Sequence, residues 1–204
     1  MSNPQLSLVE TKRFSVPPGG RWFRRLAPVL DANEKQSGFV MAWDAPHRDN
    51  KIYGIYQGLS ADEMIRCLNA VPPEQRHGYE IMLHHETCPG YMLLKWSGEL
   101  EPTHKTLKEA VRRLISRCVD PLRPAPCIKA FCNSRGTHHS YYITVPNLLF
   151  INNHSGQMAR FFDLGMDEID LGVYNKNQTL LLPGNRTRGS DTPLNEVSSI
   201  NCYI

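Results

Sequence analysis

The chain has 204 residues, of which 41% are hydrophobic and 21% are charged, and its formal net charge is +3. This length is enough for one domain with a substantial core, while the small charge disfavours a dedicated nucleic-acid binder, because such proteins concentrate basic residues. No apolar run approaches the roughly 18 residues of a membrane-spanning helix, and residues 1–14 lack the apolar segment of a signal peptide. We therefore expect an intracellular protein, cytoplasmic or nuclear, with no membrane partner.

The first third of the chain predicts an arm followed by alternating helices and strands. Residues 1–18 are polar and irregular and are interpreted as an N-terminal arm. Apolar residues at helical spacing begin at Trp22, and strand-like runs follow at 38–43 and 51–56. Ser60 opens the sequence Ser-Ala-Asp-Glu, which is typical of a capping box at the start of a helix.

The remainder of the chain carries the strongest helix pattern and most of the strands. Strand-like runs are predicted at 79–83, 91–96, 127–132, 140–145, 169–174 and 179–182. An amphipathic helix over 103–118 has the apolar stripe Leu107, Val111, Leu114, Ile115 and Cys118. A second helix pattern covers 155–162, and residues 185–204 form an irregular tail. Helices interleaved with strands indicate an α/β (α+β) core over 19–184, with a central mixed sheet and flanking helices.

Several segments, in order, resemble the archaeo-eukaryotic primase superfamily and, within it, the primase-polymerase branch. They are RWFRRLAPVL (21–30), GFVMAW (38–43) with KIYGIY (51–56), HGYEIM (77–82), NSRGTHHSYYI (133–143) with NNHSGQM (152–158), and EIDLGVYNKNQTLLLPGNRTRG (168–189). The order and spacing of these segments carry the resemblance, which implies a primase-polymerase-like core with its three motifs on neighbouring strands.

The chemistry of that family implies a particular set of site residues. Two carboxylates one residue apart, with a third from another strand, hold two divalent cations, because Mg²⁺ prefers hard oxygen ligands and two ions clamp the attacking and leaving oxygens. A Ser-x-His strand binds the triphosphate of the incoming nucleotide. By this resemblance, Asp170 in the third motif is the surviving metal carboxylate.

The first and second motifs depart from the family pattern. The apolar run 91–94 leads into Lys95 and Ser97, and a period of two places both on the face where the carboxylates belong. A lysine there opposes a divalent cation. In the second motif Ser140 is retained, but Tyr142 replaces the histidine and carries no positive charge near neutral pH. The neighbouring His138 and His139 are placed in the preceding turn.

The basic residues and an alternative register complete the predicted site. Where the family places arginines in its last strand this chain has Gln178 and Leu181, so that Arg186 and Arg188 are the remaining candidates for nucleotide binding. Glu99 and Glu101 also have the spacing of metal carboxylates and, together with Asp170, would hold Mg²⁺ or Mn²⁺ in an active primase or polymerase. Gly98 makes this alternative less favourable, because a glycine at that position suggests that the strand ends before Glu99.

The first motif, the second motif and the arginines of the last strand all depart from the family pattern. Together these departures favour a vestigial site formed by Lys95, Ser97, Ser140, Tyr142 and Asp170. We therefore expect a non-enzymatic protein with no cofactor, in which the primase-polymerase fold is reused for a structural, self-assembling role of the viral matrix or occlusion type. Its partner would be itself, as a homo-oligomer or ordered array, with the strand-like ends LSLVE (6–10) and VSSINCYI (197–204) pairing with a neighbour's sheet edge. Passive nucleic-acid binding is the other alternative, which the small net charge disfavours.

Overall fold

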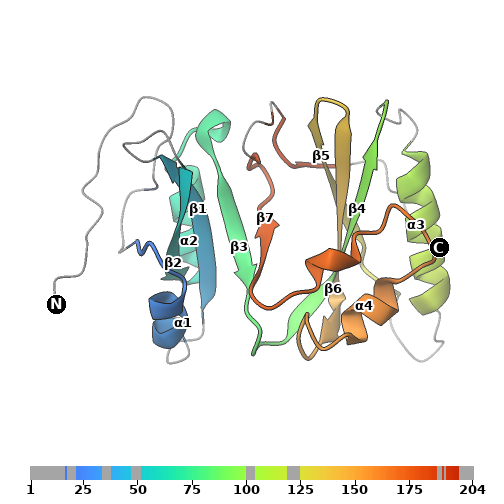
Figure 1. Cartoon of the computed structure of the whole chain (residues 1–204), viewed down its shortest axis with the longest axis horizontal. Coiled ribbons are helices and arrows are strands. Elements are labelled where there is room, and N and C mark those ends of the chain that lie inside the picture. Colours follow the sequence, from blue (N-terminus) through green and yellow to red (C-terminus); the bar gives the residue numbers. More distant parts are fainter. Residues whose placement is uncertain are drawn as a thin grey trace. The chain divides into compact units, whose positions relative to one another are not determined.

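The computed structural model describes residues 17, 22–33, 38–46, 52–99, 104–118, 125–187, 190 and 192–197. It divides into two compact units, Met1–Ile81 with Thr179–Arg188 and Met82–Gln178 with Gly189–Ile204. Each unit contains a four-stranded sheet and helices (Figure 1). The mixed α/β class is confirmed, but the strands form two sheets rather than the single central sheet expected, because strand periodicity carries no information about which strands pair.

The first unit is built on a sheet of order β2-β1-β3-β7. Its elements are α1 (Ala27–Asn33), β1 (Phe39–Pro46), β2 (Ile52–Leu59), α2 (Ala61–Asn69), the 3₁₀ helix η1 (Pro73–Gln75), β3 (Gly78–Met82) and β7 (Gln178–Leu181). β1 is antiparallel to both β2 and β3. The helix expected from Trp22 begins later, at Ala27, because Phe23 forms two backbone hydrogen bonds of 2.8 Å with Tyr56 on β2.

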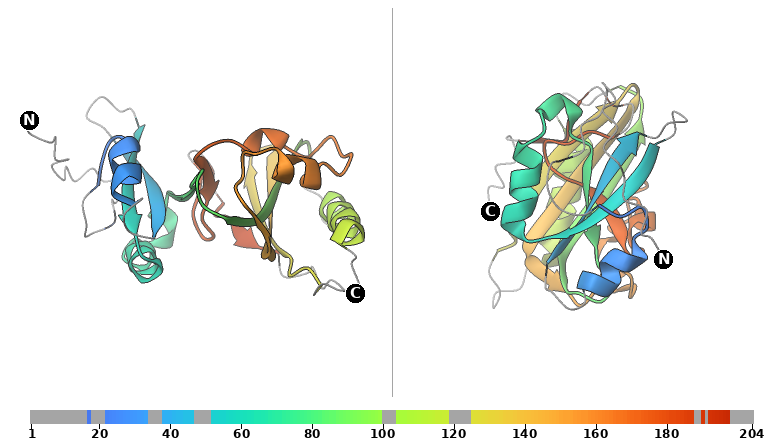
Figure 2. Two further views of the ribbon diagram at one scale, coloured as in Figure 1. Left: turned by 90° about the horizontal axis from the view of Figure 1, so that it is seen from below. Right: turned by 90° about the vertical axis from the view of Figure 1, so that its left-hand side faces the viewer.

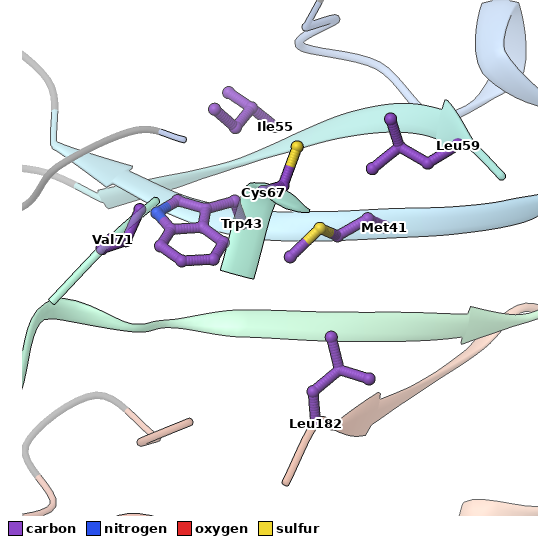
Figure 3. Packing of buried hydrophobic residues seen from close by; sticks show 7 residues of the cluster. All are labelled: Met41, Trp43, Ile55, Leu59, Cys67, Val71 and Leu182. Carbon is purple, nitrogen blue, oxygen red and sulfur yellow. The ribbon is translucent and has the colours of Figure 1, made fainter. Parts of the chain in front are cut away.

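The core of the first unit lies between α2 and the sheet. The capping box is confirmed: Ser60 Oγ accepts from Glu63 N at 3.3 Å, and Ser60 N donates to Glu63 Oε2 at 2.8 Å. α2 then contributes Cys67 to a cluster of buried side chains (Figure 3). The cluster consists of Met41, Trp43, Ile55, Leu59, Cys67, Val71 and Leu182.

The second unit is built on a sheet of order β4-β6-β5-β8, and all of its pairings are antiparallel. Its elements are β4 (Cys88–Ser97), α3 (Lys105–Cys118), β5 (Lys129–Arg135), β6 (His138–Phe150), α4 (Gln157–Phe162), the 3₁₀ helix η2 (Leu171–Val173) and β8 (Asn195–Glu196). α3 lies along one face of this sheet (Figure 2). It buries Leu107, Ala110, Val111 and Leu114, close to the predicted stripe.

Two segments of the second unit differ from the prediction. The run 169–174 is not a strand: Ile169 forms an isolated bridge with Leu94, and η2 follows, because the Asp170 side chain accepts from Gly172 N and so closes a tight turn. The predicted tail boundary at 184 also differs, since β8 pairs with β5 and Leu194 is buried. Without β8, the outer side of β5 would leave backbone N–H and C=O groups unpaired. The two residues of β8 pair with these groups, although their sequence shows no strand periodicity.

The segments proposed to pair with a neighbouring chain lie almost entirely outside the described residues, which hold none of 1–16 or 198–204. Val197, the first residue of the second segment, donates its backbone N–H to Ala130 O of this chain's own β5 at 2.8 Å. Within the described segments, no helix is long and apolar enough to cross a membrane.

Candidate functional site

The register of β4 and β6 defines the face that carries the candidate site. Lys95 lies opposite Ser140, and Ser97 lies opposite His138. Directly opposed residues of an antiparallel pair project to the same side of the sheet, so these four residues share one face. On β6, Ser140, Tyr142 and Thr144 are partly buried, whereas the alternate residues His139, Tyr141, Ile143 and Val145 are buried on the other face. The predicted alternation of this strand is confirmed.

The centre of the site is an ion pair between Lys95 and Asp170. Lys95 Nζ lies 2.5 Å from Asp170 Oδ2, with the lysine side chain 55% exposed and the aspartate 28% exposed. The second carboxylate oxygen, Oδ1, accepts from Gly172 N at 2.9 Å. Both oxygens of Asp170 therefore have donors from this chain, and the lysine ammonium balances the charge of the carboxylate.

Backbone pairing at the outer edge of β4 brings these two residues together. Asp170 N donates to Leu93 O at 2.9 Å, and Lys95 N donates to Glu168 O at 2.7 Å. Residues 168–170 thus run alongside β4 for one step of a ladder. Since Lys95 and Asp170 are 75 positions apart in the sequence, this short pairing is what fixes the ion pair.

Two buried tyrosines and an asparagine hold the segment after Asp170. Tyr91 OH donates to Val173 O at 3.0 Å, and Tyr174 OH donates to Tyr91 O at 2.9 Å. The fully buried Asn153 donates through Nδ2 to Tyr91 OH at 3.3 Å and to Asn175 O at 2.7 Å. Burial raises the pKa of Tyr91 to about 12, although the hydrogen bond from Asn153 opposes this shift. Burial raises the pKa of Tyr174 as well.

Tyr142 stands where the resemblance places a phosphate-binding histidine. Burial raises the pKa of Tyr142, and the nearby charge of Asp170 raises it further. The phenol is therefore neutral across the physiological range and can donate one hydrogen bond, but it supplies no positive charge. Neither Tyr142 nor its neighbour Ser140 can provide the electrostatic contact with a triphosphate that the family pattern implies.

His138 lies on the same face as the other site residues, although it was predicted to lie in a turn. The turn consists of Gly136 and Thr137, and β6 already begins at His138, whose Nδ1 lies 2.8 Å from Ser97 Oγ. Gly136 is the signal in the sequence for this turn, because two-residue hairpin loops favour glycine. A loop of Gly136 and Thr137 places His138 at the start of the next strand. His139 is also on the strand, but it points to the opposite face, where its Nε2 lies 3.1 Å from Gly98 O.

Among the alternative metal ligands and the arginines, the structure describes Glu99 and Arg186. Glu99 is exposed beyond the end of β4, where its backbone carbonyl accepts from Trp96 Nε1 at 3.4 Å. Arg186 belongs to the first unit, where its backbone N donates to Arg76 O at 3.0 Å. Glu101 and Arg188 lie outside the described residues.

Comparison with protein-family models finds no match, and comparison with curated protein sequences finds none either. The likeness to primase-polymerases therefore stays a prediction from the motifs.

The site residues do not fit the two-metal centre that this likeness implies. Such a centre needs several anionic oxygens around two divalent cations. Here Lys95 on β4 presents an ammonium to Asp170, and the carboxylate is already bound to that ammonium. Ser97, two residues further along the same face of β4, offers only a hydroxyl. Within the described segments, no three His, Cys, Asp or Glu side chains are grouped so as to hold a metal ion.

The Tyr91 network predicts a pH-dependent stability. Because the pKa of Tyr91 is raised from 10.0 to about 12 in the folded chain, the folded state binds more protons than the unfolded state in this range. The contribution is complete below pH 10 and is lost as the pH rises through 12, with a ceiling of about 3 kcal/mol. In urea unfolding, the free energy of unfolding of the wild type should fall more steeply from pH 10 to 12 than that of Tyr91→Phe. Parallel curves would contradict this account.

Carboxylates in place of Lys95 and Ser97 on β4 should create a metal site. We expect the double variant Lys95→Asp with Ser97→Glu to bind Mn²⁺ roughly tenfold or more tightly than the wild type, because it removes the ammonium from Asp170 and adds two carboxylates to the same face of the sheet. Electron paramagnetic resonance of free Mn²⁺ measures the binding. Adding Asp170→Asn to the double variant is the control and should remove the gain. A wild-type affinity equal to that of the double variant would show that Lys95 does not exclude the cation.

Proposed function

We propose that this chain is a non-enzymatic protein built on a degenerate primase-polymerase-like core, and that it serves a structural role by associating with further copies of itself. The observation that carries the proposal is the ion pair between Lys95 and Asp170. A nucleotidyl transferase of this kind gathers negative charge in order to hold cations. In this chain a cationic side chain balances that negative charge, so that Asp170 is not free to act as a metal ligand.

Self-association is supported by apolar side chains on the surface of the second unit. Leu149, near the end of β6, and Ile151, directly after it, are each 68% exposed. Pro89, which lies opposite Leu149 on β4, is exposed as well. Single exposed apolar residues are ordinary on a protein surface. Here Pro89 and Leu149 are paired across β4 and β6, and Ile151 follows directly after β6, so that the three form a candidate patch for contact with another protein. A second copy of the chain presents the same patch, so a two-fold contact would cover both.

The proposal predicts that the chain assembles in a concentration-dependent way and that the patch contributes to assembly. In sedimentation velocity, the full-length wild type should shift to larger species as its concentration rises. Leu149→Ser with Ile151→Ser should weaken that shift, because it removes apolar area from the contact. The matched control is Ile65→Ser, which changes a 53% exposed residue on α2 in the first unit and should behave as the wild type.

A wild-type chain that sediments as a monomer at every concentration would refute the structural role. Equal assembly of the double serine variant and the wild type would refute the contribution of the Leu149 patch.

A further inference from the structure

The positive charge of the chain is concentrated in α3. Its sequence, KTLKEAVRRLISRC, contains five basic residues and one acidic residue, giving +4, whereas the whole chain carries +3. The rest of the chain therefore carries a net charge of −1. The small net charge of the whole chain disfavours nucleic-acid binding, but the charge is unevenly distributed, and α3 alone is strongly basic. Local charge density rather than net charge sets the attraction to a polyanion.

Two of the arginines on α3 hold the helix in place. Arg113 Nη1 donates to Leu164 O at 2.8 Å and to Gly165 O at 3.0 Å. Arg117 Nη1 donates to three backbone carbonyls at the end of α4, with distances of 2.6 to 3.1 Å. These contacts fasten α3 to α4 and the loop that follows it. The remaining basic residues of α3 are thus presented on a fixed helix.

The other three basic residues, Lys105, Lys108 and Arg112, form a stripe on the exposed side of α3. Their spacing of three and then four residues places them on one side of a helix, and all three are exposed. Together with Glu109 they line one open stretch of the surface of α3. No ion pair joins Lys105 or Lys108 to another described residue.

Glu109 offsets only part of the positive charge on this side of α3, because its one carboxylate pairs with Arg112 and Arg113 and with neither lysine. Its carboxylate accepts from Arg112 at 2.8 and 2.9 Å and from Arg113 at 2.6 Å. These two guanidinium groups, Arg112 first, lower the pKa of Glu109 to about 2. The single negative charge is shared between two arginines, and both lysines are left to attract an anion.

The surroundings of the stripe favour a nucleic acid over a membrane. A helix that binds a membrane surface needs an apolar face to insert between lipids. The large apolar residues of α3 are directed into the second unit instead, and none of the exposed large hydrophobic residues among the described positions belongs to α3. A helix with cationic side chains and no exposed apolar side matches the phosphodiester backbone, whose contacts are mainly with lysine and arginine.

We propose that Lys105, Lys108 and Arg112 bind the backbone of a nucleic acid without reading its sequence. At 1.5 Å per residue, the stripe extends about 10 Å along the helix, which corresponds to about three base-pair steps of 3.4 Å. The stripe is also separate from the Lys95–Asp170 ion pair. His104, directly before α3, lies 2.6 Å through Nδ1 from the hydroxyl of Tyr141, whose side chain is on the buried face of the sheet, opposite that of Lys95. The proposed nucleic-acid surface is therefore distinct from the candidate site around Lys95 and Asp170.

Fluorescence anisotropy with an arbitrary DNA duplex and an arbitrary single strand tests the proposal. The variant Lys105→Gln/Lys108→Gln/Arg112→Gln should reduce the slope of log affinity against log salt by about two to three, and the affinity by roughly tenfold or more at low salt, since each phosphate contact contributes about 0.7 to 0.9 to the slope. Arg113 still holds Glu109 in this variant, so α3 should keep its place. Circular dichroism checks this.

The matched control, Lys129→Gln/Arg135→Gln/Lys176→Gln, removes three exposed cations elsewhere in the second unit. It should bind DNA within about twofold of the wild type. An equal loss in the control would assign binding to the general charge of the chain and overturn the proposal. The proposal is also overturned if the wild type binds no DNA at low salt. Binding to vesicles of phosphatidylserine and phosphatidylcholine without binding to DNA would assign the stripe to a membrane surface instead.

Discussion

The ion pair between Lys95 and Asp170 is the interaction on which the functional account depends. Its direct contribution to stability is small, because partly exposed pairs of this kind contribute about 0–1 kcal/mol. Its importance is electrostatic: the ammonium balances the carboxylate that a metal centre on this face would need. The backbone around the pair is well supported, since residues 168–170 pair with β4 and Tyr91 and Asn153 hold the turn that follows. The position of the ion pair is therefore fixed by backbone pairing and buried side chains around it.

The parts of the fold that could be predicted are those governed by local rules. The capping box at Ser60 and the apolar stripe of α3 need only neighbours within one or two helical turns, and both lie where the sequence placed them. The pairing of strands is a long-range property, which explains why one expected sheet became two. β8 was missed for the same reason, because a two-residue strand has no periodicity and forms only on the edge of β5.

The candidate site shows the same division between local and long-range information. A period of two placed Lys95 and Ser97 on one face, and β4 has both on the face shared with Ser140. The contact with Asp170 required the edge pairing of residues 168–170, which no local pattern signals. His138 was misplaced by the assumption of a longer turn, and it lies beside Ser97. The concentration of charge in α3 was visible in the sequence, but the assignment of Arg113 and Arg117 to backbone carbonyls required the structure.

A primer-extension assay on the unmodified protein tests the central claim most directly, namely that the lysine on β4 has replaced the metal centre. With a primed DNA template, all four deoxynucleotides and either Mg²⁺ or Mn²⁺, the account predicts no extended product at any protein concentration. Extension by the wild type that disappears in Glu99→Gln or Asp170→Asn protein would contradict it. That result would mean that Glu99 and Asp170 hold the cations and that the ion pair with Lys95 opens during the reaction.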